Sequence, residues 1–300
     1  MITGGSNYVN INWDYDNPVI GTYHLFRDKV ESDLASMFEH GQRKIALVCW
    51  YAPLNFPAAQ DHRWGHIVDC YGGVMFEQHQ QNLVELLALI ERTGFNQVNF
   101  RFAATAKAGT GQWTEWNREQ FNEDWLFTDS VRDLVVANTS LAVMFDLGVE
   151  HANTALQSDK LRQLFVRRMW RLYTEAHGPD DSCGFSIIHG PAGLSPMLNQ
   201  FRVGKLPMPA CYCFDNYTTP GRVLSESVEV LRTLGEQDKP VYMQETFYND
   251  AQACSEIKEA VAQSGINFKG IFQWPRVRDR DPHDFPDVFP KRFDNYLVET

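Results

Sequence analysis

The chain has 300 residues, and 44% of them are hydrophobic, which is enough for one large domain or two ordinary ones. Its formal net charge of -11 at pH 7 argues against nucleic acid and anionic membranes as partners, because both attract basic proteins. A neutral or cationic substrate suits this charge better.

No apolar run approaches the length of about 18 residues that a membrane-spanning helix needs. The first residues lack the basic and apolar regions of a signal peptide, so we expect a cytoplasmic protein or one released without a Sec signal. The six cysteines form no CxxC pair, which favours buried free thiols over disulfides or a zinc site.

Residues 1–16 show no clear period, and we predict that they form a lead-in covering the floor of the fold or packing on its side. From Pro18 onward one unit repeats, consisting of a short apolar run, a loop and an amphipathic helix. The eight apolar runs, each typical of a buried parallel strand, are 19–24, 44–51, 96–103, 141–148, 184–189, 210–215, 241–245 and 268–274.

Helices are expected behind nearly all of these runs, with only a short helix at most behind the fifth. Eight runs separated by helices predict a single α/β domain, a (β/α)8 TIM barrel over 1–300 that ends in a closing segment, 276–300. A doubly wound sheet is the alternative, but no GxGxxG follows the first run and no phosphate-binding GxxxxGK motif occurs.

In such a barrel the carboxyl ends of all strands meet at one face, where ligands bind. Carboxylates beside flat aromatic rings suit sugars, whose C–H faces stack on rings while their hydroxyls form directed hydrogen bonds. A buried arginine also needs an acidic partner. The candidate residues at or just past the ends of the runs are His24, Trp50, Tyr51, Arg101, Asp146, Glu150, His189, Asp215, Tyr217, Glu245 and Trp274.

This layout resembles the clan of retaining glycoside hydrolases on (β/α)8 barrels, in which the acid/base ends strand four and the nucleophile ends strand seven. Glu150 follows the fourth run, and Glu245 lies in PVYMQETF at the seventh. Trp274 in GIFQWP resembles the tryptophan that floors the sugar subsite after strand eight. One departure is that Gly148 and Val149 precede Glu150, where the clan usually has asparagine.

The resemblance implies cleavage of an O-glycosidic bond in an oligo- or polysaccharide by two carboxylates, without a metal or other cofactor. Glu245 would be the nucleophile, and Glu150 the acid/base, its pKa raised by burial and nearby negative charge. Arg101 and Tyr217 would orient Glu245, while Trp274 and Trp50 stack on the sugar. The other substrate contacts it implies are Tyr51, Asp146, His189, Asp215 and His24.

Two other interpretations remain open. If GFSIIHGP were the fourth strand, His189 would replace the acid/base region, and the barrel would be an inactive carbohydrate-binding or scaffold protein. A metal-dependent barrel hydrolase is the second, although the first run has no HxH and the sixth has no histidine. Its candidate ligands are His24, His62, His66, His151, His189, Asp146 and Asp215.

Overall fold

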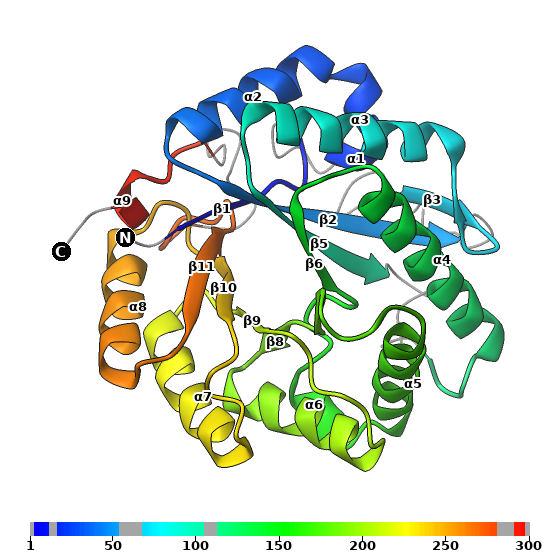
Figure 1. Cartoon of the computed structure of the whole chain (residues 1–300), viewed down its shortest axis with the longest axis vertical. Coiled ribbons are helices and arrows are strands. Elements are labelled where there is room, and N and C mark those ends of the chain that lie inside the picture. Colours follow the sequence, from blue (N-terminus) through cyan, green and yellow to red (C-terminus); the bar gives the residue numbers. More distant parts are fainter. Residues whose placement is uncertain (1–2, 12–16, 54–67, 105–112, 281–290, 298–300) are drawn as a thin grey trace.

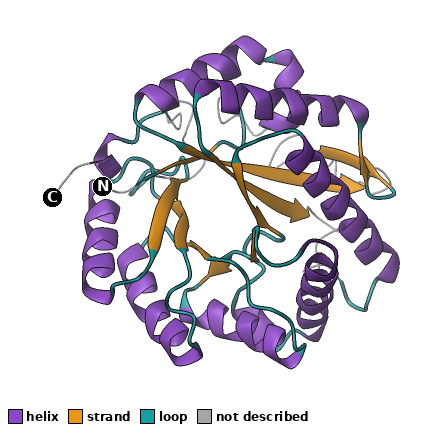
Figure 2. Ribbon diagram, in the orientation of Figure 1, coloured by secondary structure: helices purple, strands orange, loops and turns teal. Residues whose placement is uncertain are grey.

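A ring of helices surrounds a curled parallel sheet in the computed structural model of the chain (Figures 1 and 2), which describes residues 3–11, 17–53, 68–104, 113–280 and 291–297. The strands pair in the order β7-β6-β5-β2-β1-β11-β10-β9-β8, and every pair along this path is parallel. Their bounds are β1 Gly4–Asn7, β2 Lys44–Pro53, β5 Gln97–Ala104, β6 Ala142–Asp146, β7 Ser182–Gly184, β8 Ile187–Ile188, β9 Tyr212–Asp215, β10 Val241–Thr246 and β11 Phe268–Gln273.

The ring of strands closes through β7 and β8, which are two parts of one crossing of the barrel. β7 pairs with β6, and β8, which begins only three residues after β7 ends, pairs with β9 on the other side. Counted in this way, the chain has the eight strands of a (β/α)8 barrel, and the predicted fold is confirmed. β6 is the fourth strand, so the alternative in which GFSIIHGP is the fourth strand is wrong.

Helices follow all the strands of the barrel, and their apolar faces cover the sheet. In α2 and α5 the buried side chains include Val30, Leu34, Phe165 and Met169, which have the spacing that predicted these helices. The helices are α2 Arg27–Glu39, α3 Glu77–Thr93, α4 Arg118–Ala137, α5 Lys160–His177, α6 Pro191–Val203, α7 Pro220–Leu234, α8 Ala251–Ser264 and α9 Asp294–Leu297. Shorter elements are α1 Val19–Thr22, η1 Tyr23–Leu25, η6 Thr154–Gln157, β3 Val68–Tyr71 and β4 Val74–Met75.

The first strand is not where the apolar pattern placed it. Residues 19–24 form α1 and part of η1 instead of a strand, and the true first strand, β1, lies in the segment predicted to be a lead-in. A Cβ atom on Gly4 would lie 1.9 Å from the Ile271 carbonyl oxygen, and one on Gly5 would lie 1.7 Å from that of Lys44. Glycine is therefore required where β1 approaches its neighbours, and it leaves no apolar signal.

The connection after the fifth strand was also predicted wrongly. It forms α6, a helix of 13 residues, although Pro196 lies inside it. Pro191 stands at the helix start, where its missing N–H costs nothing. Gly193 brings α6 close to the end of β8, since a Cβ atom there would lie 2.3 Å from the Ile188 carbonyl oxygen.

The prediction for the cysteines agrees with the structure. All six cysteines are free and buried.

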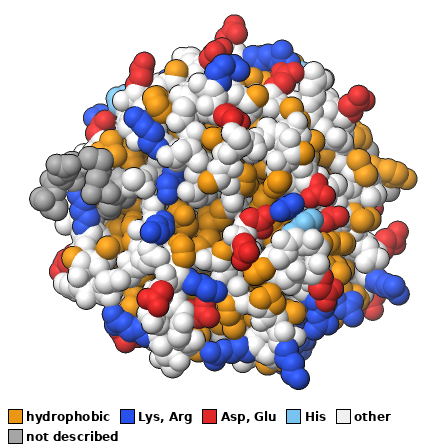
Figure 3. Space-filling view, in the orientation of Figure 1, with side chains coloured by type: hydrophobic (Ala, Val, Ile, Leu, Met, Phe, Trp, Pro, Cys, Tyr) orange, Lys and Arg blue, Asp and Glu red, His pale blue; other side chains and the backbone are white. Residues whose placement is uncertain are grey.

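Lys, Arg, Asp and Glu side chains are interspersed over the face of the molecule shown in Figure 3, and hydrophobic side chains show near its centre. None of the helices that the structure describes has both the length and the apolar character needed to cross a bilayer.

Asp124 of α4 is a buried carboxyl group packed behind β2. Its Oδ1 accepts hydrogen bonds from the Tyr51 hydroxyl at 3.2 Å and from Gln120 Nε2 at 3.0 Å. Its Oδ2 is buried without a hydrogen-bond partner among the described residues. Burial raises the pKa of Asp124 to about 8, although the two donors lower it. The folded protein therefore holds this carboxyl group mostly protonated at neutral pH.

We expect Asp124→Asn to stabilise the protein at neutral and higher pH. Because the folded pKa lies above the unfolded value, the carboxyl group costs more stability as pH rises from about 4 to about 8. Asparagine keeps the acceptor oxygen and does not titrate. In urea denaturation, the free energy of unfolding of the Asp124→Asn protein should exceed that of the parent by about 1 to 3 kcal/mol near pH 8 and by almost nothing near pH 4.

The matched control for this measurement is Asp133→Asn, which changes a carboxylate that is 63% exposed on the same helix. It should alter the free energy of unfolding by less than about 0.5 kcal/mol. A gain for Asp124→Asn that is the same at both pH values would contradict the proposed protonation of Asp124.

Candidate active site

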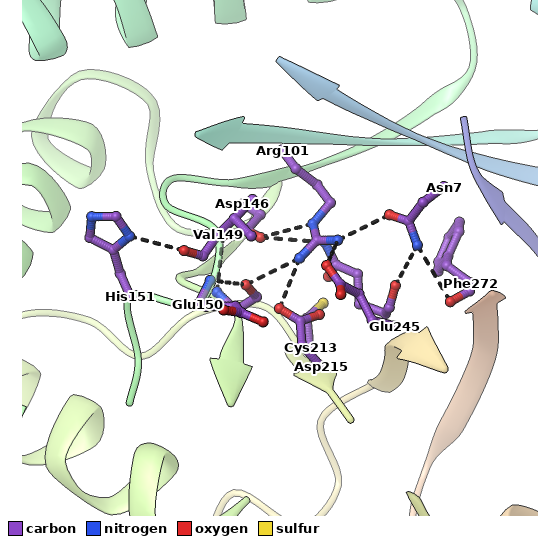
Figure 4. A network of polar contacts seen from close by, with 12 residues as sticks. Asn7, Arg101, Asp146, Val149, Glu150, His151, Cys213, Asp215, Glu245 and Phe272 are labelled. Atoms are coloured by element: carbon purple, nitrogen blue, oxygen red, sulfur yellow. Dashed lines mark hydrogen bonds and ion pairs between the residues drawn. The ribbon is translucent and has the colours of Figure 1, made fainter. Parts of the chain in front are cut away.

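The side chain of Arg101 lies at the centre of the barrel and is fully buried. It projects inward from β5, and its guanidinium group reaches groups on four other strands (Figure 4). Nη1 donates to Glu245 Oε1 at 2.6 Å and to Asn7 Oδ1 at 3.0 Å, Nη2 donates to Asp215 Oδ2 at 2.8 Å, and Nε donates to Asp146 Oδ2 at 3.2 Å. We call these five residues the Arg101 network.

The network contains more negative than positive charge. Three carboxyl groups contact one guanidinium. Glu150 is a fourth acidic group, and its charge acts on Asp215. Burial opposes the charge of Arg101, but Asp215, Glu245 and Asp146 outweigh it and raise the pKa of Arg101 further. Burial also raises the pKa of Asp215 well above its usual range; Arg101 opposes this shift, while Glu245 and Glu150 add to it. Burial and the neighbouring carboxyl groups thus favour the protonated form of Asp215, whereas Arg101 favours its charged form.

Glu245 has a donor on each oxygen of its carboxyl group. It stands near the end of β10 and is 4% exposed. Arg101 donates to Oε1, and the hydroxyl of Tyr217, just past β9, donates to Oε2. The guanidinium of Arg276 lies 5.1 Å from the centre of the Tyr217 ring. This arrangement holds the carboxylate in one orientation and compensates its charge.

Glu150 lies in the turn after β6 and has a different environment. Its backbone is left-handed, with φ of 56°, which costs energy in a residue other than glycine. The backbone N–H donates to Ser186 Oγ at 2.8 Å, and the side chain is half-buried. Burial, followed by the negative charge of Glu245, raises the pKa of Glu150 to about 7, although Arg101 opposes the shift. A proton on this carboxyl group is therefore easily gained and lost near neutral pH.

Asp146 braces the turn that carries Glu150. Its Oδ1 accepts hydrogen bonds from the backbone N–H groups of Gly148 at 3.1 Å and Ser186 at 2.9 Å, while Oδ2 faces Arg101. The side chain is fully buried. The sequence placed Asp146 among the substrate contacts. In the structure its side chain supports the turn that carries Glu150 and contacts Arg101.

Trp50 and Trp274 lie together at the inner wall of the barrel. Both are partly buried and pack on one small apolar cluster, which also includes Val149, the residue before Glu150. Trp274 follows β11, and its backbone N–H donates to the Thr246 carbonyl oxygen at 2.8 Å. The two rings that the sequence predicts to stack on a sugar thus share one apolar surface with Val149.

Three predicted contacts do not join this group. Tyr51 neighbours Trp50 on β2 and therefore points to the opposite face, where its ring stacks on Phe127 with centroids 4.2 Å apart. His24 lies in η1 rather than at a strand end, and its Nδ1 is 3.0 Å from Asn82 Nδ2 of α3. His189 is exposed in the turn before α6 and makes no described contact with the Arg101 network. The structure thus places Tyr51 and His24 away from the Arg101 network.

Sequence reasoning missed two residues of the site. Asn7 comes from β1, and its Nδ2 donates to the Gln244 carbonyl oxygen at 2.8 Å. Ser186 connects β7 to β8 and contacts both Arg101 and the Glu150 backbone. The only available signal was that each is a polar residue in a strand-like position, and for Asn7 the strand itself was not recognised.

The metal-dependent interpretation finds little support in the site. Among the described residues, no group of three or more histidine, cysteine or acidic side chains is placed to hold a metal ion. A guanidinium occupies the centre of the carboxylates, and His151 packs against Phe165 and Phe185. His62 and His66 lie outside the described residues.

Comparison with solved structures identifies the architecture. An exo-β-1,4-mannosidase from Opitutaceae bacterium strain TAV5 matches with a TM-score of 0.60 and 15% identity, over 99% of this chain and 58% of its own. A glycoside hydrolase family 5, subfamily 18 protein from Streptomyces cattleya, solved with Manβ1-4GlcNAc, matches with a TM-score of 0.61 and 13% identity, over 98% and 78%. The chain shares the (β/α)8 barrel fold of these two proteins.

A third protein with this barrel fold is the family 53 catalytic domain of Ignisphaera aggregans, with a TM-score of 0.55 and 14% identity over 91% of this chain and 84% of its own. The chain spans 58% of the length of the mannosidase. No protein-family model matches the sequence, and the comparison with curated proteins found no match. At 10% to 15% identity, what the chain shares with these solved structures is its fold.

We expect replacement of the central cation by Arg101→Met to destabilise the protein strongly. It leaves three buried carboxyl groups without their counterion, which should lower the free energy of unfolding by about 3 to 5 kcal/mol. Because these groups then bind protons more tightly in the folded state, the loss should be larger near pH 8 than near pH 5. Chemical denaturation at both pH values measures this.

Arg132→Met is the matched control, since Arg132 pairs with Asp181 at 2.7 Å but keeps its side chain 17% exposed. It should cost less, about 1 kcal/mol, with little dependence on pH. A pH-independent loss for Arg101→Met would contradict the electrostatic account of the Arg101 network.

Proposed function

We propose that the protein is a retaining glycosidase, with Glu245 as the nucleophile and Glu150 as the acid/base. The observation that carries this proposal is the difference between the two glutamates. Glu245 has charge-compensating donors on both oxygens, whereas Glu150 sits beside it with a pKa near 7. A carboxylate held by two donors, together with a second carboxyl group that can carry a proton, is what this mechanism requires.

The proposed reaction begins with attack of a Glu245 oxygen on the anomeric carbon. The bond from that carbon to the leaving oxygen breaks, and Glu150 gives its proton to the departing oxygen, so that a covalent glycosyl-enzyme forms. Glycosylation removes the negative charge of Glu245, one of the causes that raise the pKa of Glu150. Glu150 is then a carboxylate that takes a proton from water as the water oxygen attacks the anomeric carbon. The bond from that carbon to Glu245 breaks, and the sugar is released with its original configuration.

The substrate we propose is a neutral β-linked glycoside, with β-mannosides as the first to test. Solved structures of the same fold include an exo-β-1,4-mannosidase and subfamily 18 proteins bound to Manβ1-4GlcNAc. Trp50 and Trp274 offer stacking surfaces for a sugar ring. The excess of carboxyl groups disfavours anionic sugars, whose charge would be repelled.

The proposed roles of the glutamates predict different effects of substitution. Glu245→Gln removes the nucleophile and should lower kcat/KM on 4-nitrophenyl β-mannoside by about 10⁴-fold or more. Glu150→Ala should slow turnover by about 10²- to 10⁴-fold. Sodium azide should then restore turnover of Glu150→Ala by reacting with the glycosyl-enzyme, and NMR should identify the product as the β-glycosyl azide.

Glu236→Gln serves as the matched control, because Glu236 pairs with Lys239 at 2.9 Å and takes no part in the Arg101 network. It should leave kcat/KM unchanged. Full activity in Glu245→Gln, or an α-configured azide product, would exclude the retaining mechanism with these roles.

The pH dependence of activity should report the proton on Glu150. Because this carboxyl group must be protonated for the first step, kcat/KM should fall as pH rises above about 7. In Glu245→Gln the neighbouring charge is absent, so the pKa of Glu150, followed by ¹³C NMR of labelled glutamate, should decrease. A pKa that stays the same in Glu245→Gln would show that the two groups do not interact.

A further inference from the structure

Ser186 connects the two glutamates of the site. It lies between β7 and β8 and is fully buried. Its Oγ accepts hydrogen bonds from the backbone N–H of Glu150 at 2.8 Å and from Arg101 Nη2 at 3.4 Å. Arg101 in turn holds Glu245 through Nη1 at 2.6 Å. One hydroxyl group therefore joins the turn that carries Glu150 to the guanidinium that orients Glu245.

The position of Glu150 depends on its backbone. In the part of the chain that the structure describes, no hydrogen-bond donor contacts its carboxyl group, although Asn153 Nδ2 donates to its carbonyl oxygen at 2.8 Å. Its left-handed conformation is unfavourable and persists only when surrounding contacts hold it. The Ser186 hydroxyl is the acceptor that fixes its N–H.

The backbone of Ser186 makes separate contacts that a change of side chain would leave in place. Its N–H donates to Asp146 Oδ1 at 2.9 Å, and its carbonyl oxygen accepts from the Ala152 N–H at 3.2 Å. These bonds hold the fifth strand against the turn after β6. Replacing only the hydroxyl therefore removes the contacts to Glu150 and Arg101 and keeps the surrounding structure.

We propose that Ser186 is a positioning residue, whose hydroxyl holds the left-handed turn so that the Glu150 carboxyl group faces the leaving oxygen of the substrate. This inference rests on the proposed function, because it assigns Ser186 to the acid/base step of the same site. Its hydroxyl contacts the backbone of Glu150 and the guanidinium of Arg101, so it acts through Glu150.

The test is the dependence of rate on the leaving group in Ser186→Ala. A leaving group that needs a proton, as in phenyl β-mannoside, should show kcat/KM lowered by about 10- to 100-fold, whereas 2,4-dinitrophenyl β-mannoside should lose less than about 3-fold. A loss of equal size for both substrates would overturn the proposal. In a Glu150→Gln background the same substitution should have almost no further effect on either substrate.

Ser182→Ala is the matched control. Ser182 is also fully buried and lies in the same strand, but its hydroxyl donates to the Phe145 carbonyl oxygen at 2.8 Å and accepts from the Gly184 N–H at 3.0 Å. It should change stability without changing the dependence on the leaving group. If Ser186→Ala does not fold, Ser186→Cys supplies a weaker acceptor at the same position, and the same unequal loss is expected.

A measurement without substrate separates this inference from the proposed function. In Ser186→Ala the turn should relax and expose the Glu150 carboxyl group, so its titration followed by ¹³C NMR should move to lower pH, whereas in Ser182→Ala it should not. If the parent protein cleaves none of the aryl glycosides but this shift occurs, the positioning role stands and the glycosidase proposal fails. If the parent is active and the titration in Ser186→Ala is unchanged, the positioning role is wrong.

Discussion

The structure depends on one buried cation, Arg101, and the carboxyl groups that surround it. A guanidinium in the interior of a barrel is unstable without anions, and the carboxyl groups of Asp146, Asp215 and Glu245 are equally unstable without it. The partners come from strands distant in the sequence, so the network forms only when the barrel closes. Closing the fold and assembling the site are therefore the same event.

The excess of negative charge in this network has a chemical consequence. One guanidinium faces three contacting carboxyl groups and Glu150 as well, and burial together with this negative charge raises the pKa of Asp215 and of Glu150. Glu245 receives two donors, while Glu150 depends on a serine that holds only its backbone. The same electrostatic arrangement that stabilises the interior thus distinguishes an acid from a nucleophile in the proposed mechanism.

The likeness to an exo-β-1,4-mannosidase and a family 53 catalytic domain lies in the fold, because 14% to 15% identity leaves few side chains in common. A (β/α)8 barrel supports many reactions, since its strand ends can present almost any set of residues. The proposed chemistry depends on the contacts of Arg101, Glu150, Ser186 and Glu245. The barrel architecture alone does not specify a reaction, so the proposed function depends on those contacts.

Much of the fold was predictable from local pattern. Seven of the eight predicted runs overlap strands of the barrel, and the positions of Glu150 after the fourth strand and Glu245 in the seventh follow from counting those strands. Arg101 had to have acidic partners because an unpaired buried charge is too costly. The first strand escaped prediction because Gly4 and Gly5 are required by close approach of the backbone and leave no apolar signal.

The sequence by itself determined the class of fold, the acidic and aromatic character of the strand ends, and the need for a partner to Arg101. Only the tertiary structure decided that Asn7 and Ser186 belong to the site, that Tyr51 faces α4, and that Glu150 is left-handed. The physical reason is that the spacing of apolar residues along the chain indicates only which face of a single helix or strand is buried. It does not record which distant strands pair, or in which register, and those pairings bring the side chains of the site together.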